Sequence, residues 1–171
     1  MRMPLTAMQI ARKTRLELDT CSSALVMMAR MGIVNCLNPN SKNCRVYRLT
    51  EIGTEIQKNL ESEFNVSRPG DIIIPEGIDW ELYGLVCYRQ RSAVIQAITQ
   101  PMQPCQIKRY LKIHKPHITI SQNNIRDIKN EFLKYGIIQK VFLRKRAHPA
   151  YEMTGQGLIF QKLLNQAEMP M

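Results

Sequence analysis

The sequence predicts an α+β, mostly α fold that consists of two tandem winged helix-turn-helix domains. The stretch from Phe132 to Gly157 has the pattern of a helix end, a strand, a basic turn, a return strand and the cap of another helix, which is the second half of such a domain. The stretch 28–60 matches 132–164 without a gap, so the pattern occurs twice. A chain of 171 residues also has room for two domains of roughly 60 to 95 residues.

The residues that are identical in the two copies of the repeat include those expected to form its turns and to start its helices. Gly136 suits the left-handed residue that follows a helix, and Thr154 can cap the next helix through its hydroxyl. A shift of 104 residues joins these identical pairs: Gly32 and Gly136, Ile33 and Ile137, Tyr47 and Tyr151, Thr50 and Thr154, Gly53 and Gly157, and Gln57 and Gln161. Such agreement indicates that one structural unit is used twice.

The first domain is expected at residues 1–63, with its first helix missing. Thr6 caps a short helix that ends near Thr14, and Asp19 caps a second helix. A strand, a turn, a second strand and a closing helix follow at 33–37, 38–43, 45–49 and 50–62. Only five residues precede Thr6, too few for the helix that normally opens such a domain. Either that helix lies upstream, or another part of the assembly covers the core.

A linker at 64–77 precedes the second domain, which is expected at 78–171. Asp79 caps an amphipathic helix that is expected to run to about Thr99 and to supply the first helix that the other domain lacks. The helix-turn-helix follows as a helix, a turn and a second helix at 104–114, 115–120 and 121–135, and Ser121 is expected to cap the second helix.

The composition excludes several classes of protein. The hydrophobic fraction of 44% is too high for disorder, no apolar run approaches the roughly 20 residues of a membrane span, and no signal peptide is visible. We therefore expect a cytoplasmic protein with no membrane partner. Five cysteines without regular spacing predict neither disulfides nor a zinc site. Because no nucleophile with a base, paired carboxylates or phosphate loop is visible, we expect no enzyme, cofactor or metal.

The formal charge of +10 is unevenly distributed along the chain. Residues 1–64 carry 9 Lys and Arg against 6 Asp and Glu, and residues 78–171 carry 14 against 6. The second domain therefore holds most of the attraction for a polyanion such as DNA. Charge alone would equally serve to keep the surface soluble, so the fold has to decide between the two interpretations.

The third helix of the second domain is the candidate recognition helix. Ile125, Ile128, Phe132 and Tyr135 are expected to face the core. The residues on the opposite face are then Asn123, Arg126, Asp127, Asn130 and Lys134. Asn and Arg pair with adenine and guanine edges in the major groove, and base contacts concentrate near the start of such helices. The predicted base contacts are Gln122, Asn123, Asn124, Arg126 and Asn130. The alternative is a polar face that contacts only solvent.

Basic residues are candidates for contacts with DNA phosphates. Three adjacent cations on a hairpin can reach a row of phosphates or a narrow minor groove, unless they form only a solvated turn. The predicted backbone or minor-groove contacts are Lys134, Arg144, Lys145, Arg146 and His148 in the second domain and Arg12, Lys13 and Arg15 in the first.

The equivalent helix of the first domain offers a poor reading face. The shift of 104 places there, or close by, the residues Asp19, Ser22, Ser23, Leu25, Val26, Met27 and Arg30. An apolar belt around a helix indicates burial on both sides. We expect either that this helix packs in an interface, within the chain or between two chains of a possible homodimer, or that the small domain needs a wide core stripe.

Several stretches resemble archaeal winged-helix transcriptional regulators. They are LTAMQIARKT and MARMGIVNCLNPNSKNCRVYRLTEIG in the first domain, and DWELYGLVCYRQRSAVIQAI and FLKYGIIQK in the second. The strand-to-helix signature VYRLTEIG carries Tyr47, Leu49, Thr50 and Gly53. The resemblance covers most of the chain at the level of the fold and implies DNA binding through the third helix and the wing, often as a dimer. The sequence departs from the pattern in the missing first helix and the weak reading face of the first domain.

The sequence thus predicts a sequence-specific double-stranded DNA-binding transcriptional regulator that uses a recognition helix and a basic wing. The alternative is a tandem winged-helix protein–protein interaction module in a chromosome or transcription complex, because the fold alone permits both. An RNA-binding module has less support, since the aromatic residues, at 6%, form no platform for stacking bases.

Overall fold

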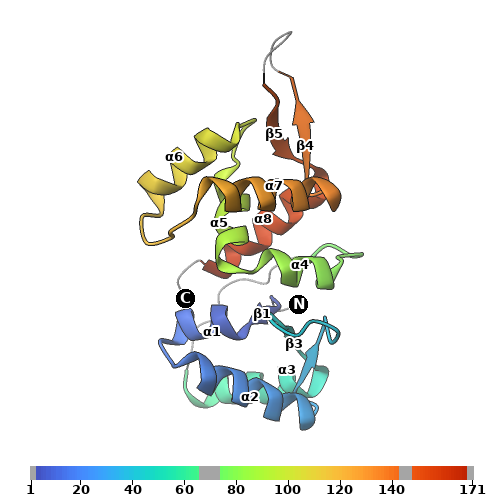
Figure 1. The fold of residues 1–171 in the computed structure, drawn as a ribbon. Coiled ribbons are helices and arrows are strands. Elements are labelled where there is room, and N and C mark those ends of the chain that lie inside the picture. Colours follow the sequence, from blue (N-terminus) through green and yellow to red (C-terminus); the bar gives the residue numbers. More distant parts are fainter. Residues whose placement is uncertain (1–2, 66–73, 143–147, 169–171) are drawn as a thin grey trace. The chain divides into compact units, whose positions relative to one another are not determined.

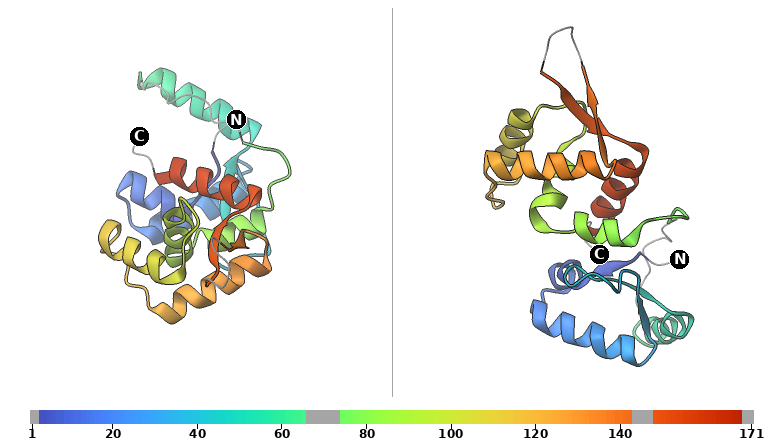
Figure 2. Two further views of the ribbon diagram at one scale, coloured as in Figure 1. Left: turned by 90° about the horizontal axis from the view of Figure 1, so that it is seen from above. Right: turned by 45° about the vertical axis from the view of Figure 1, so that its right-hand side comes forward.

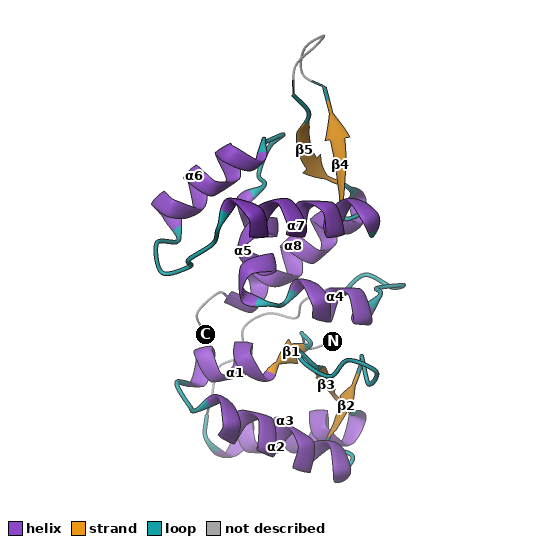
Figure 3. Cartoon of the chain, viewed as in Figure 1, coloured by secondary structure: helices purple, strands orange, loops and turns teal. Residues whose placement is uncertain are grey.

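Within residues 3–65, 74–142 and 148–168, which the computed structural model describes, the chain is α+β and mostly α, as predicted (Figure 1). It divides into two compact units: residues 1–85 with 167–171, called unit 1, and residues 86–166, called unit 2. Each contains a helix-turn-helix, a two-stranded hairpin and a further helix, which is the winged-helix arrangement (Figure 3).

Unit 1 places a helix-turn-helix against a three-stranded antiparallel sheet of order β1–β3–β2. Its elements are β1 Leu5–Thr6, α1 Ala7–Thr14, α2 Leu18–Arg30, β2 Val34–Cys36, β3 Val46–Leu49, α3 Glu51–Glu63 and α4 Trp80–Val86. Leu25, Val34 and Tyr47 form a small buried core between the helices and the sheet. A core of this size leaves much of α2 and α3 outside it.

Unit 2 surrounds one buried helix with the helix-turn-helix, the hairpin and the last helix. Its elements are α5 Arg89–Ala97, α6 Pro104–His114, α7 Gln122–Lys134, β4 Ile138–Val141, β5 Ala150–Met153 and α8 Gly155–Glu168. Five of the nine residues of α5 are buried, and in Figures 1 and 2 this helix lies between α7 and α8. Met102 pairs with Tyr151 through two backbone hydrogen bonds of 3.0 and 2.9 Å, as β1 pairs with β3 in unit 1.

Local sequence signals set the starts of several helices. Thr6 and Ser121 cap α1 and α7 as predicted, because each hydroxyl accepts a hydrogen bond from the backbone N–H three residues later, at 3.3 and 3.0 Å. Helix α2 differs from the prediction. It begins at Leu18 with Glu17 at the N-cap, so Asp19 lies in its first turn, where a carboxylate still favours the helix dipole.

The prediction of one helix from Asp79 to Thr99 is wrong. The chain forms α4 and α5 instead, and between them Tyr88 is extended, with φ −61° and ψ 140°. Helix α4 is held within unit 1, because the Glu81 carboxylate accepts hydrogen bonds from Asn40 N at 3.2 Å and Ser41 Oγ at 2.6 Å. The division between the units falls at 85/86, whereas the sequence placed a domain start at 78.

The same turn closes the hairpin in both units. In each, a threonine hydroxyl donates to the carbonyl of an earlier glycine and accepts from the N–H of the glycine three residues later. The atoms are Thr50 Oγ1 with Gly32 O (2.7 Å) and Gly53 N (3.0 Å), and Thr154 Oγ1 with Gly136 O (2.6 Å) and Gly157 N (3.2 Å). The first glycine of each set has a positive φ, +71° at Gly32 and +66° at Gly136. Residues 104 positions apart thus make the same hydrogen bonds.

Thr154→Val is expected to destabilise the protein by about 1 to 2 kcal/mol, because valine keeps the shape but removes the hydroxyl that serves Gly136 O and Gly157 N. Urea unfolding followed by circular dichroism measures the loss. Thr154→Ser retains the hydroxyl and is the control, with a smaller expected loss. Equal losses in the two variants would show that the methyl group, and not the hydroxyl, stabilises this turn.

Candidate nucleic-acid interface

Helix α7 presents one polar face to solvent. The prediction that Tyr135 faces the core is wrong, because this residue lies at the C-cap of the helix and is 41% exposed. Ile125, Ile128 and Phe132 are buried against the rest of unit 2, as predicted. Because an α-helix turns by about 100° per residue, the residues opposite them form one continuous face. The exposed residues on that face are Asn123, Arg126, Asp127, Asn130 and Lys134, as the sequence predicted. Three of the five predicted base contacts therefore share one face with Lys134.

Helix α5 fixes the position of α7. The guanidinium of Arg91 makes two hydrogen bonds to the Glu131 carboxylate, Nε to Oε2 at 2.7 Å and Nη2 to Oε1 at 3.1 Å. Both side chains are partly buried, so solvent screens this paired contact less than it would screen a surface pair. On the other side of α7, the ammonium of Lys129 lies 5.1 Å from the ring centroid of Tyr151 in β5. The helix is thus tied to both α5 and the hairpin.

The other two predicted base contacts lie at the edges of the face. Asn124 turns toward α5, where its Nδ2 donates to Gln90 Oε1 at 3.2 Å, and Gln90 Nε2 in turn donates to Thr119 O at 2.9 Å. A base contact by Asn124 would require that hydrogen bond to open. Gln122 is half-buried. The structure therefore groups Asn123, Arg126 and Asn130 more closely than the prediction did.

The hairpin β4–β5, called the wing, projects beside α7 (Figure 1). Its register runs from Ile138 opposite Met153 to Val141 opposite Ala150. The predicted contacts Arg144, Lys145 and Arg146 lie outside the described residues. His148 is exposed, and its backbone carbonyl accepts a hydrogen bond from Gln103 Nε2 at 3.3 Å.

Helix α6 adds cations that the sequence reasoning did not select. Lys108, Arg109 and Lys112 are all exposed on this first helix of the helix-turn-helix. Lys108 and Lys112 are four residues apart and therefore lie on one helix face, and Arg109 is adjacent to Lys108. This spacing of cations in the sequence could have identified them. They extend the candidate phosphate contacts of unit 2 beyond α7 and the wing.

The corresponding surface of unit 1 is weaker in charge. Arg12 Nη1 lies 3.8 Å from Oε1 of Glu168, which is at the end of α8 and belongs to unit 1 with Ala167. Lys13 is half-buried, and Arg15 is exposed with φ +59°. Unit 2, residues 86–166, has 14 Lys and Arg against 3 Asp and Glu, a net charge of +11, which leaves −1 for the rest of the chain out of +10. Attraction for a polyanion is therefore concentrated in unit 2.

The described residues hold no group of three or more His, Cys, Asp or Glu side chains placed to bind a metal ion. In the same parts of the chain, no helix combines the length and apolar character needed to cross a membrane.

A helix-turn-helix, a wing and an exposed polar helix face in a basic unit define a winged-helix protein. No family model matches the chain, and no curated protein matches it. Among solved structures, ScpB from Mycobacterium tuberculosis is similar, with 14% sequence identity over 95% of this chain and 87% of that chain and a TM-score of 0.24. A TM-score this low carries no argument about fold or function, so the fold rests on the elements described above.

Proposed function

We propose that the chain is a sequence-specific double-stranded DNA-binding regulator of transcription. It acts in the cytoplasm without catalysis or a cofactor. Unit 2 makes the contacts: α7 reads base edges in the major groove, and the wing and α6 contact phosphates.

The observation that carries this proposal is the exposed face of α7. Asn123, Arg126 and Asn130 stand together on it, and Asn and Arg are the residue types that make paired hydrogen bonds to adenine and guanine. The net charge of +11 on residues 86–166 provides the general attraction to phosphates. A polar face that only contacts solvent would need neither the base-reading residue types nor the surrounding cations.

Selection of bound duplexes from a random DNA pool by the full chain tests the proposal. We expect one motif to be enriched, and its affinity to fall with salt at a logarithmic slope of about −0.9 per phosphate contact. Fluorescence anisotropy of the selected duplex at several salt concentrations measures that slope. Failure to enrich any motif, together with weak and salt-insensitive binding, would contradict the proposal.

Alanine at Arg144, Lys145 and Arg146 together is expected to weaken the binding of selected and random DNA by the same factor. If all three cations contact phosphates, the salt slope becomes shallower by about 2.7. A variant with alanine at Lys42, Arg45 and Lys58 of unit 1 removes the same charge elsewhere and is the matched control. Equal losses in both variants would assign the effect to net charge rather than to contacts of the wing.

A protein–protein interaction module is the second candidate, and one observation favours it. Unit 1 holds most of the large exposed apolar side chains, among them Met27, Met31, Ile52 and Phe64. Capture of a protein partner that persists at high salt, with DNA binding absent, would favour this function over the first.

A further inference from the structure

The last helix of each unit has a different environment, although the two helices match in sequence. On α8, Phe160 and Leu164 are each 1% exposed, whereas their counterparts 104 residues earlier on α3, Ile56 and Leu60, are 40% and 49% exposed. Helix α2 shows the same contrast, since Met28 is 40% exposed and its counterpart Phe132 on α7 is 0% exposed. The apolar belt of α2 is therefore not a wide core stripe, which rules out that alternative.

In unit 2, helix α5 contacts both α8 and α7. It contacts α8 through Gln161, whose Nε2 donates to Ile95 O at 2.7 Å and to Ile98 O at 3.1 Å. It contacts α7 through the ion pair of Arg91 with Glu131. In the described part of unit 1, β1 leads directly into α1, and no helix covers the matching surface.

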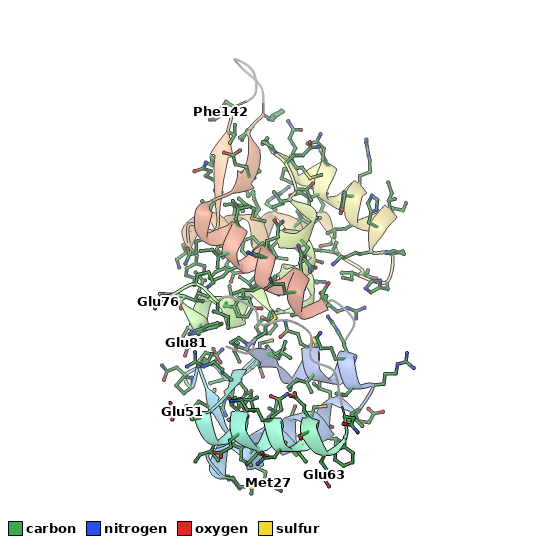
Figure 4. The ribbon with its side chains drawn as sticks, turned by 180° about the vertical axis from the view of Figure 1, so that it is seen from behind. Met27, Glu51, Glu63, Glu76, Glu81 and Phe142 are labelled. Carbon is green, nitrogen blue, oxygen red and sulfur yellow. The ribbon has the colours of Figure 1, made fainter. Side chains whose placement is uncertain are left out.

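That surface, called the α2–α3 face, consists of exposed apolar residues on both helices. They are Met27, Met28 and Met31 of α2 and its C-cap, and Ile52, Ile56, Leu60 and Phe64 of α3 and its C-cap. Figure 4 views unit 1 from the side of α3, with Glu51 and Glu63 at the two ends of that helix and Met27 at the lower edge. The residues of α3 repeat every four positions, the spacing of a ridge that packs against another helix.

The repeat also places a glutamine of α3 at the position of a glutamine that contacts α5 in unit 2. Gln57 is the counterpart of Gln161, and its Oε1 is buried with no hydrogen-bond partner among the described residues. In unit 2 the equivalent side chain binds the carbonyls at the C-terminal end of α5. It does so through the donor Nε2, whereas the unpartnered atom of Gln57 is the acceptor Oε1, so the two glutamines match by their position in the repeat and not by this contact.

We infer that the α2–α3 face binds an amphipathic helix with basic edges from a partner protein. The apolar side of the partner helix resembles that of α5. In unit 2, Arg91 of α5 pairs with Glu131, but the residue of unit 1 at the position of Glu131 is Met27. The partner helix therefore carries no arginine at the position of Arg91, because that arginine would be left unpaired. Its edges are basic because Glu51, Glu55 and Glu63 are exposed beside the apolar residues of α3. This inference concerns unit 1 and does not depend on DNA binding by unit 2.

A second copy of the chain fits the face less well. Helix α3 carries four glutamates and one lysine, so pairing it with another α3 would bring like charges together along the interface. A basic helix meets the same edges with opposite charge.

The probe is a synthetic peptide of residues 88–99, YRQRSAVIQAIT, cross-linked to hold it as a helix, because a free helix of this length is marginal. Fluorescence anisotropy with the full chain measures binding. We expect the Arg91→Leu peptide to bind about tenfold more tightly than the parent, because an unpaired arginine no longer meets Met27. A further Gln96→Glu change should weaken the peptide, because Gln96 Nε2 donates to Asn165 Oδ1 in unit 2 and Glu61 of α3 occupies the position of Asn165 in unit 1.

Leu60→Glu in the chain is expected to reduce binding of the Arg91→Leu peptide at least about tenfold, since it places a charge in the centre of the face. Leu158→Glu is the matched control, because Leu158 is 54% exposed on α8 of unit 2, and it should leave binding unchanged. Phe64→Glu, at a residue 68% exposed, repeats the test if Leu60→Glu lowers the helical circular dichroism.

Two outcomes overturn the inference. One is that neither peptide binds, or that Leu60→Glu and Leu158→Glu affect binding equally. The other is that sedimentation shows the chain alone to be a dimer that Leu60→Glu converts to a monomer, which would make a second copy the occupant of the face.

Discussion

Gly157→Ala is expected to destabilise unit 2 by about 3 kcal/mol, because there is no space for a side chain at this position. A Cβ there would lie 2.1 Å from Ile137 O and 3.0 Å from Met153 Sδ. The sulfur can move aside, but Ile137 O accepts the backbone hydrogen bond of Thr154 at 3.1 Å and cannot move without loosening the turn. Urea unfolding of the full chain, followed by circular dichroism, measures the change.

Gly155→Ala, two residues earlier in the same helix, is the matched control. A Cβ at Gly155 would meet nothing within 4 Å, so the variant should be neutral or more stable by up to about 1 kcal/mol. Gly53→Ala repeats the experiment in unit 1, where the Cβ would lie 2.0 Å from Ile33 O. If the variants at Gly157 and Gly155 unfold at the same urea concentration, the close approach does not limit stability.

The fold could be predicted where it depends on neighbours in the sequence. A hydroxyl that caps a helix, as at Thr6 and Ser121, acts on an N–H only three residues away. The glycine after α7, Gly136, has φ +66°, which its residue type suggests without knowledge of the rest of the chain. The repeat then transferred these local predictions from one unit to the other.

The break between α4 and α5 could not be predicted in this way. No glycine or proline stands at Cys87 or Tyr88, and the apolar spacing continues through both positions. Helix α4 makes contacts that are distant in sequence, such as the hydrogen bonds of Glu81 with the loop at 40–41, and these cannot be read from the helical pattern. Tertiary contacts of this kind override a helical pattern.

Some features of the candidate site could be predicted from the sequence, and others could not. The exposed face of α7 follows from the spacing of its three buried residues, so Asn123, Arg126 and Asn130 could be found from the sequence. The position of Asn124 could not, because its partner Gln90 is 34 residues away on another helix. Residue spacing shows which side of a helix is polar, but not which polar side chains a neighbouring helix engages.

Arg126→Ala combined with Asn130→Ala is expected to reduce affinity for the selected DNA site by about 2 to 6 kcal/mol, because each side chain contributes about 1 to 3 kcal/mol of discrimination when it reads a base. Affinity for random duplex DNA should fall far less, since only one positive charge is lost. Fluorescence anisotropy with both duplexes at one salt concentration measures the two losses. The ratio of the losses reports base reading, whereas phosphate contact alone would lower both affinities together.

The repeat provides a control at the same helix positions. Ser22 and Val26 of α2 correspond to Arg126 and Asn130, so Ser22→Ala with Val26→Ala changes the matching face of unit 1. We expect this variant to bind the selected site as the unchanged chain does, because Asp19 and the apolar side chains beside Val26 are poorly suited to a groove lined with phosphates. An equal loss of specificity in both variants would mean that both units read DNA. The assignment of the DNA contacts to unit 2 alone, which was inferred from the charges, would then be wrong.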